Sequence, residues 1–194
     1  MANQSADVFS GLLVLVVTDL AGFTSIVSEL GDVPALECIR IHNRLLREVV
    51  RRYAGYEVTH TGDGMITAFR SVAAALRCAQ EIQRALSEHT RNFPNAPLRA
   101  RVGVHAGEPL PEDGRLFGAC VNTAVRVCAH AQAEHVLVTD VVKQLAAGRD
   151  FEFTSCTRVE LKGLLHEVQL HELACGQLHV SVSSDLGHAE AEVA

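Results

Sequence analysis

The sequence predicts an α+β fold, in which an antiparallel-rich sheet is covered by helices. Apolar strands and amphipathic helices follow one another in the order βααββαβαβ, which lacks the regular strand–helix alternation of a doubly wound parallel sheet. Two successive strands are separated only by the tight turn Thr-Gly-Asp-Gly at residues 61–64, which is typical of an antiparallel hairpin. With 194 residues, the chain is long enough for one domain with its own core.

The first half of the chain begins with the apolar run Leu12 to Thr18, which predicts a buried strand. A turn-rich segment then opens into a short helix. Asp32 and Pro34 suit the first turn of a longer helix, which we expect Gly55 to end. The two strands of the predicted hairpin are Tyr56 to Thr59 and Met65 to Phe69.

The second half begins with a helix capped by Ser71, in which apolar residues recur every three or four positions. The alternating segment Leu98 to His105 predicts a strand, and Pro109 to Gly118 a polar loop. A helix from about Cys120 to Ala131 follows. The last predicted elements are a strand at Val136 to Thr139, a short helix from Asp140 to about Ala147, and short strands at Phe151 to Thr154, Arg158 to Leu161 and Val168 to Glu172.

Composition and charge exclude several classes of protein. The net charge of −6 argues against binding to a nucleic-acid backbone, which requires a basic surface. No apolar run reaches the length of a membrane span and the N-terminus lacks a signal pattern, so we expect a soluble cytoplasmic protein without membrane contact. The six cysteines form no CxxC pair and are expected to be reduced core residues. We expect one domain over residues 11–174 and flexible ends at residues 1–10 and 175–194.

Two aspartates occupy the same kind of position. Asp19 follows the first apolar strand, and Asp63 lies in the hairpin turn directly before another apolar run. A carboxylate at the end of a buried strand is costly unless it is paired or holds a metal. Brought together by neighbouring strands, the two would form a site for divalent cations. Taken singly, Asp63 could be an ordinary turn residue and Asp19 a helix N-cap.

Five sequence blocks resemble, in the same order, the motifs of class III nucleotide cyclases. The blocks are DLAGFT at 19–24, GDGM at 62–65, RVGVHAGE at 101–108, FGACVNTAVR at 117–126 and LKG at 161–163. Together they extend over roughly residues 11 to 173. The resemblance implies a ferredoxin-like βαββαβ core. It also implies an enzyme that converts a nucleoside triphosphate into a 3′,5′-cyclic nucleotide and pyrophosphate.

The resemblance implies that Asp19 and Asp63 bridge two divalent cations, Mn²⁺ or Mg²⁺, with the carbonyl of Leu20 completing one shell. Two such ions suit the chemistry, because one lowers the pKa of the 3′-hydroxyl and the other holds the charge of the leaving group. The backbone amides of the Ala21-Gly22-Phe23-Thr24 segment lead into a helix. Their N–H groups and the helix dipole are therefore suited to receive phosphates, and the residues assigned to this role are Gly22, Phe23 and Thr24.

Asn122 and Arg126 are four positions apart and therefore share one helix face. In the family the asparagine orients the ribose, and the arginine offsets charge that grows at the α-phosphate. Lys162 is expected to reach the triphosphate or, equally, to be a solvated turn lysine. Family members supply the aspartates and the Asn/Arg pair from different subunits. The resemblance therefore implies a homodimer with two equivalent sites at its interface.

The base-recognition positions depart from the family patterns. Adenylate-type members carry lysine where this chain has Thr59, and aspartate or threonine where it has Arg115. Arginine offers only donors, which suit the carbonyl oxygens of uracil or guanine better than the adenine amine. Guanine's N1–H and amine would still need an acceptor, for which only the Thr59 hydroxyl is available, whereas uracil has a single N3–H, so UTP and cyclic UMP are favoured. The short chain also resembles the stand-alone bacterial pyrimidine cyclases of antiviral signalling, which make cyclic UMP or cyclic CMP. The alternatives are an adenylate cyclase with an unusual pocket, in which Arg115 points to solvent, or an inactive nucleotide-binding module derived from a cyclase.

Overall fold

The computed structural model of the chain describes residues 9–164 and 166–176 of the 194. The two predicted flexible ends, residues 1–10 and 175–194, therefore lie almost entirely outside the described residues. Phe9, the first described residue, is buried and packs edge-on against the ring of Tyr56. None of the helices in the described ranges is long and apolar enough to cross a membrane.

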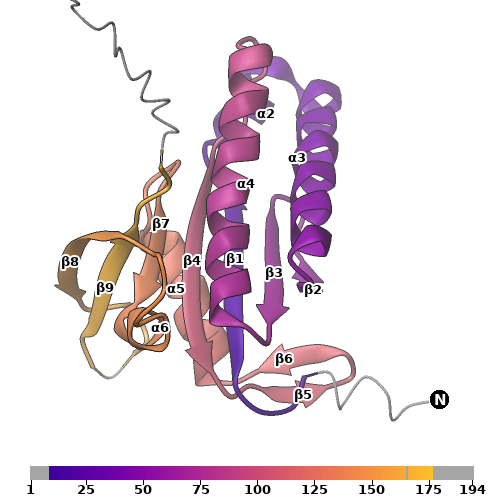
Figure 1. The fold of residues 1–194 in the computed structure, drawn as a ribbon. Coiled ribbons are helices and arrows are strands. Elements are labelled where there is room, and N and C mark those ends of the chain that lie inside the picture. The colour runs from indigo at the N-terminus through magenta and orange to yellow at the C-terminus, as the bar shows by residue number, and fades with distance from the viewer. Residues whose placement is uncertain (1–8, 165, 177–194) are drawn as a thin grey trace, which may run out of the picture.

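A mixed sheet of seven strands forms the centre of the domain (Figure 1). The strands are β1 Leu13–Leu20, β2 Tyr56–His60, β3 Gly64–Phe69, β4 Ala100–Gly107, β7 Val136–Thr139, β8 Phe153–Val159 and β9 Val168–Leu173. They lie in the order β2-β3-β1-β4-β7-β9-β8, and only the β4–β7 pair is parallel. The predicted α+β fold with an antiparallel-rich sheet is thus confirmed.

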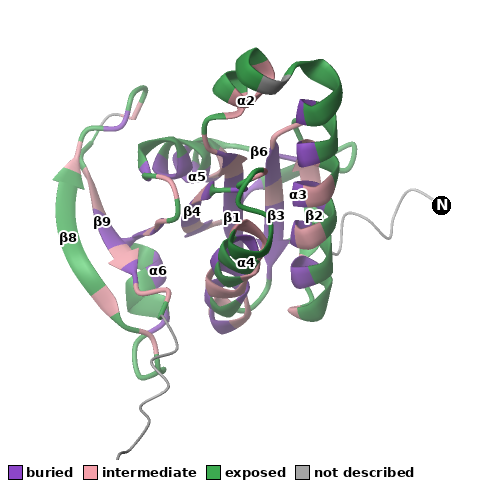
Figure 2. Cartoon of the chain, turned by 90° about the horizontal axis from the view of Figure 1, so that it is seen from above, coloured by how far each residue is buried: buried purple, intermediate pink, exposed green. Residues whose placement is uncertain are grey.

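Helices cover both faces of this sheet (Figure 2). Strand β1 contributes side chains to the core under each face. The helices are α2 Phe23–Leu30, α3 Asp32–Arg52, α4 Val72–Asn92, α5 Ala119–His130 and α6 Asp140–Leu145. Val14 and Val16 join the large core with residues of α3 and α4. Leu13, Leu15 and Val17 alternate with them and join a second core with residues of α5. The strands β9 and β8 curve away from the centre as an arm, which Figure 2 shows at the left.

Three local predictions were wrong. The first strand continues through Asp19 to Leu20, because both residues pair with β4. The predicted polar loop 109–118 contains a small hairpin of its own, β5 Leu110–Glu112 and β6 Arg115–Phe117. The separate strands expected at 151–154 and 158–161 are one continuous strand, β8. Its pairing with β9 is irregular between Phe153 and Cys156. Four of the six cysteines are buried as expected, whereas Cys156 is exposed.

Helix α5 lies against the sheet at a glycine of β4. A Cβ atom added to Gly103 would lie 2.2 Å from the backbone nitrogen of Cys128, so the helix could not keep its position. We expect Gly103→Ala to lower the free energy of unfolding by about 1–3 kcal/mol, measured by urea denaturation. Gly176→Ala is the matched control, because no atom of the described residues lies within 4 Å of the added Cβ. Unchanged stability of the Gly103 variant would contradict this close approach.

Candidate active site

The ends of β1 and β3 bring the two predicted aspartates to one place. Asp19 pairs with Gly64 in the antiparallel register, and the amide of Leu20 donates a 3.0 Å hydrogen bond to the carbonyl of Asp63. Both carboxylates are half-buried and act electrostatically on the same buried ring, that of His42. The sequence expectation that neighbouring strands bring Asp19 and Asp63 together therefore agrees with the geometry.

Most oxygens of this carboxylate pair are not engaged by protein donors. Arg101 binds Oδ2 of Asp19, whereas Oδ1 of Asp19 and the whole Asp63 carboxylate accept no hydrogen bond from the described residues. Oδ1 lies over Gly64, 3.5 Å from where a Cβ of that residue would be. The described residues include no cluster of three His, Cys, Asp or Glu side chains placed to hold a metal. The donor set of two carboxylates and a backbone carbonyl instead fits hard divalent cations that share ligands with substrate phosphates.

The start of helix α2 follows directly after β1. Gly22 takes a left-handed conformation with φ of 74°, and within the part of the chain that the structure describes no side chain caps the helix there. The amides of Phe23 and Thr24 in the first turn therefore have no helical acceptor and can receive an anion. The predicted contribution of Ala21 is wrong, because its amide donates to the carbonyl of Arg99 at 2.8 Å.

Helix α5 presents Asn122 and Arg126 to solvent, one turn apart on the face opposite the core. The exposed side chain of Val125 lies between them in sequence. Within the described residues, no hydrogen bond or ion pair joins Asn122 or Arg126 to Asp19 or Asp63. The chain therefore carries an acidic half-site at the end of β1 and a separate polar face on α5.

The residues expected to read the base or hold phosphate lie on three different elements. Thr59 is half-buried on β2, and Arg115 is exposed where β6 begins. Lys162 is exposed in a turn after β8, followed by Gly163 with φ of 84°. No hydrogen bond or ion pair joins any two of these three residues in the described part of the chain.

Comparisons with known proteins place this chain in a family. The family model described as "Adenylate and Guanylate cyclase catalytic domain" matches residues 11–175. The chain belongs to this family. A putative adenylate cyclase of Rhizobium meliloti is 32% identical over 128 residues, which cover 65% of this chain and 22% of that protein. The chain thus spans about a fifth of the length of this relative.

Two solved structures support the assignment to the cyclase family. The adenylate/guanylate cyclase/hydrolase of Silicibacter pomeroyi is 30% identical with a TM-score of 0.74, covering 84% of this chain and 96% of that one. An adenylate cyclase of Trypanosoma brucei is 25% identical with a TM-score of 0.75, covering 85% and 90%. By family and fold, this domain therefore belongs to the catalytic domains of the class III nucleotide cyclases.

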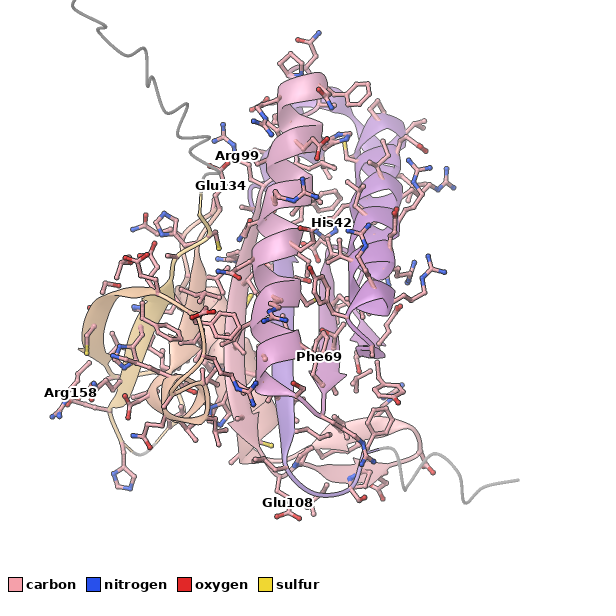
Figure 3. All side chains as sticks on the ribbon, viewed as in Figure 1. His42, Phe69, Arg99, Glu108, Glu134 and Arg158 are labelled. Atoms are coloured by element: carbon pink, nitrogen blue, oxygen red, sulfur yellow. The ribbon has the colours of Figure 1, made fainter. Side chains whose placement is uncertain are left out.

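Sequence reasoning missed three residues at or beside the candidate site. Arg101 stands within a recognised block, but only the register shows that it faces Asp19. Asn43 of α3 donates from Nδ2 to the carbonyl of Gly62 at 3.2 Å and so holds the turn that carries Asp63. His42, the third, is fully buried beside Asn43, and Figure 3 shows it between the two long helices. The helical periodicity of α3 identifies its buried face, but it gives no signal for these polar contacts.

The buried ring of His42 gives the cyclase domain a predicted sensitivity to acid. Its Nδ1 donates to Oδ1 of Asn43 at 3.2 Å, and its buried Nε2 has no partner among the described residues. Burial lowers the pKa of His42 below the usual 6.5, against smaller opposing effects of the Asn43 bond and the Asp63 and Asp19 carboxylates; His60 adds a small lowering. Below about pH 6.5 the unfolded chain therefore binds a proton that the folded chain does not.

This linkage predicts that the stability conferred by a neutral His42 is complete above pH 6.5 and is progressively lost below it. We expect His42→Leu to remove this acid-dependent loss of stability. The free energy of unfolding of the variant relative to wild type should rise by about 1 kcal/mol between pH 7.5 and pH 5.5, measured by urea denaturation. A difference between the two proteins that does not change with pH would contradict this assignment.

Proposed function

We propose that this domain cyclises a nucleoside triphosphate to its 3′,5′-cyclic monophosphate, releasing pyrophosphate. The observation that carries the proposal is the meeting of Asp19 and Asp63 at the end of β1, with unengaged oxygens, beside the uncapped start of α2. A carboxylate pair next to free helix amides suits a triphosphate and its cations. The reaction then requires in-line attack of the 3′-oxygen on the α-phosphorus.

The acidic half-site would hold two divalent cations, Mg²⁺ or Mn²⁺, through Asp19, Asp63 and the carbonyl of Leu20. When bound, the ions would lower the pKa of the 3′-hydroxyl and neutralise the leaving pyrophosphate. The chain's own residues bind and orient the substrate. The amides after Gly22 receive the phosphates, and Lys162 reaches the triphosphate from its turn.

Asn122 and Arg126 would complete the site from a second copy of the chain. Arg126 keeps its charge at any physiological pH, and its fork matches the oxygens of the α-phosphate as charge grows there. Asn122 orients the ribose. Exposed apolar side chains on the hairpin that leads into α5 support association, since Leu110 and Phe117 pair across β5 and β6 with 69% and 46% of their surfaces exposed. The proposed enzyme is a homodimer with two equivalent sites.

ATP is the substrate that the relatives support, because the Rhizobium meliloti and Trypanosoma brucei proteins are named adenylate cyclases. Adenine is also compatible with the two base positions. Its ring nitrogens accept hydrogen bonds from a donor such as Arg115, and the Thr59 hydroxyl can accept from the amine. UTP is the second candidate, favoured by the donor-only Arg115. If UTP is the substrate, the antiviral role that the sequence resemblance implies would apply as well.

A substrate assay distinguishes these candidates. Purified protein is incubated with Mn²⁺ or Mg²⁺ and equimolar ATP, GTP, CTP and UTP, and the cyclic products are identified by mass. We expect cyclic AMP to predominate, whereas cyclic UMP as the main product would support the second candidate. No cyclic nucleotide from any of the four would contradict the enzymatic function and favour an inactive binding module.

Arg115→Asp tests whether this position reads the base. If ATP is the substrate and Arg115 points to solvent, the ratio of cyclic AMP to cyclic UMP should stay within about threefold of wild type. If Arg115 donates to uracil, the acidic variant should lower use of UTP relative to ATP by about tenfold or more, the value of one good hydrogen bond to a charged group. The same competition assay measures both outcomes.

A further inference from the structure

The cation-binding aspartate of β1 already has a positively charged partner. Nε and Nη2 of Arg101 both contact Oδ2 of Asp19, at 2.7 and 2.6 Å. The two side chains are 37% and 29% exposed, so the pair is partly withdrawn from water. Among the described residues this is the one ion pair made by a carboxylate of the proposed cation site.

The sheet itself imposes this pairing. Asp19 and Arg101 stand directly opposite each other in the antiparallel β1–β4 register, and cross-strand partners point to the same face with Cβ atoms about 5 Å apart. The neighbouring residues Val17 and Gly103 are likewise paired, and both lie on the face that α5 covers. Because sliding β4 by one residue would also turn the core-forming side chains outward, the register fixes the arginine beside Asp19.

We propose that Arg101 is a resident counter-charge of Asp19, against which the divalent cations must bind. This inference rests on the proposed function, since it concerns the same cation site. The guanidinium neutralises Asp19 when no cation is bound and fixes the carboxylate so that Oδ1, over Gly64, is the oxygen left for a metal. The positive charge then lowers the affinity of the site, so that a cation binds well only together with the triphosphate, whose negative charge outweighs the arginine.

Two opposite effects of Arg101 on cation affinity must be compared. Holding Asp19 in place favours binding, because fewer side-chain rotamers are lost. Repulsion opposes it: a cation on Oδ1 would lie about 5 Å from the guanidinium, and a divalent–monovalent pair at that distance repels strongly even at high effective dielectric. The repulsion is the larger effect at a half-buried site, so removing the charge should tighten cation binding at least about tenfold.

Binding of Mn²⁺ to the nucleotide-free protein, followed by electron paramagnetic resonance, tests the proposal without measuring turnover. Arg101→Met removes the charge and the hydrogen bonds, whereas Arg101→Gln removes the charge and keeps a donor. Arg101→Lys keeps the charge with a different geometry. We expect the Met and Gln variants to bind Mn²⁺ at least about tenfold more tightly than wild type, and the Lys variant to bind within about threefold of it. If Arg101→Met does not fold, the Mn²⁺ affinity of Arg101→Gln alone tests the proposal.

The matched control is Arg158→Met, which removes the same charge from the exposed β8 strand, seen at the outer edge of the arm in Figure 3. It should leave Mn²⁺ affinity unchanged. Equal or weaker Mn²⁺ binding by both neutral variants would overturn the counter-charge while leaving the proposed cyclase site intact. A wild-type protein whose Mn²⁺ binding is unaffected by Asp63→Asn would instead overturn the cation site itself. The two failures are therefore distinguishable.

Discussion

Asp63→Ala is expected to lower the rate of cyclic nucleotide formation at least about a thousandfold, because it removes one of the two carboxylates proposed to hold the cations. The fold should not suffer. The side chain of Asp63 accepts no hydrogen bond from the described residues, and the bond to Leu20 uses the backbone carbonyl, which alanine keeps. We therefore expect the free energy of unfolding to stay within about 1 kcal/mol of wild type.

Product formation is measured by mass spectrometry with saturating Mn²⁺ and ATP, and stability by urea denaturation. Asp150→Ala is the matched control, because it removes an exposed carboxylate that has no partner in the described part of the chain. Its activity should equal that of wild type. Turnover near the wild-type rate in a folded Asp63→Ala protein would refute the assignment of this aspartate to the cation site.

Arg126→Ala is expected to lower turnover by a factor of about 10²–10³, the usual effect of removing one group that stabilises developing charge. Arg126 is exposed on α5, and no hydrogen bond or ion pair within the described residues joins it to Asp19 or Asp63, so the proposed homodimer has it contribute across the interface. Mixing the two inactive variants, Asp63→Ala and Arg126→Ala, should therefore restore activity. A heterodimer contains one site with both residues intact, and random exchange of subunits makes half of the dimers heterodimers. The mixture should reach about a quarter of wild-type activity.

The control for this restoration is a mixture of Asp63→Ala with Asp19→Ala. Every site of that heterodimer lacks one aspartate, so no activity should return. Subunit exchange is verified by mass spectrometry of the native dimers. Restoration no greater than in the control, despite exchange, would contradict a site shared between two chains.

The parts of the fold with strong periodicity could be predicted from sequence. The long helices α3 and α4 carry one apolar face each, and β1 and β3 are mostly apolar and buried, so their existence follows from the burial pattern. The β5–β6 hairpin could not be recognised, and β8 could be predicted only as two separate short strands. The residues of these strands are mostly exposed, so their sequences show no periodic apolar pattern. They are strands because they pair with a neighbouring strand.

Part of the candidate site could likewise be identified from sequence and part could not. Asp19 and Asp63 were identifiable because a carboxylate beside a buried strand needs a physical reason. Arg101 and Asn43 were not, because their importance lies in which backbone or side chain they face across the sheet. Such contacts depend on register, and sequence patterns specify register only through the burial of one face.

The most direct test of the central claim is a crystal structure of the domain with Mn²⁺ and a non-cyclisable triphosphate analogue. The account predicts anomalous density for Mn²⁺ in contact with the carboxylates of both Asp19 and Asp63. It also predicts that Asn122 and Arg126 of a second copy contact the ribose and α-phosphate of the same nucleotide. A nucleotide bound away from this pair of aspartates, or Mn²⁺ that contacts neither of them, would contradict it.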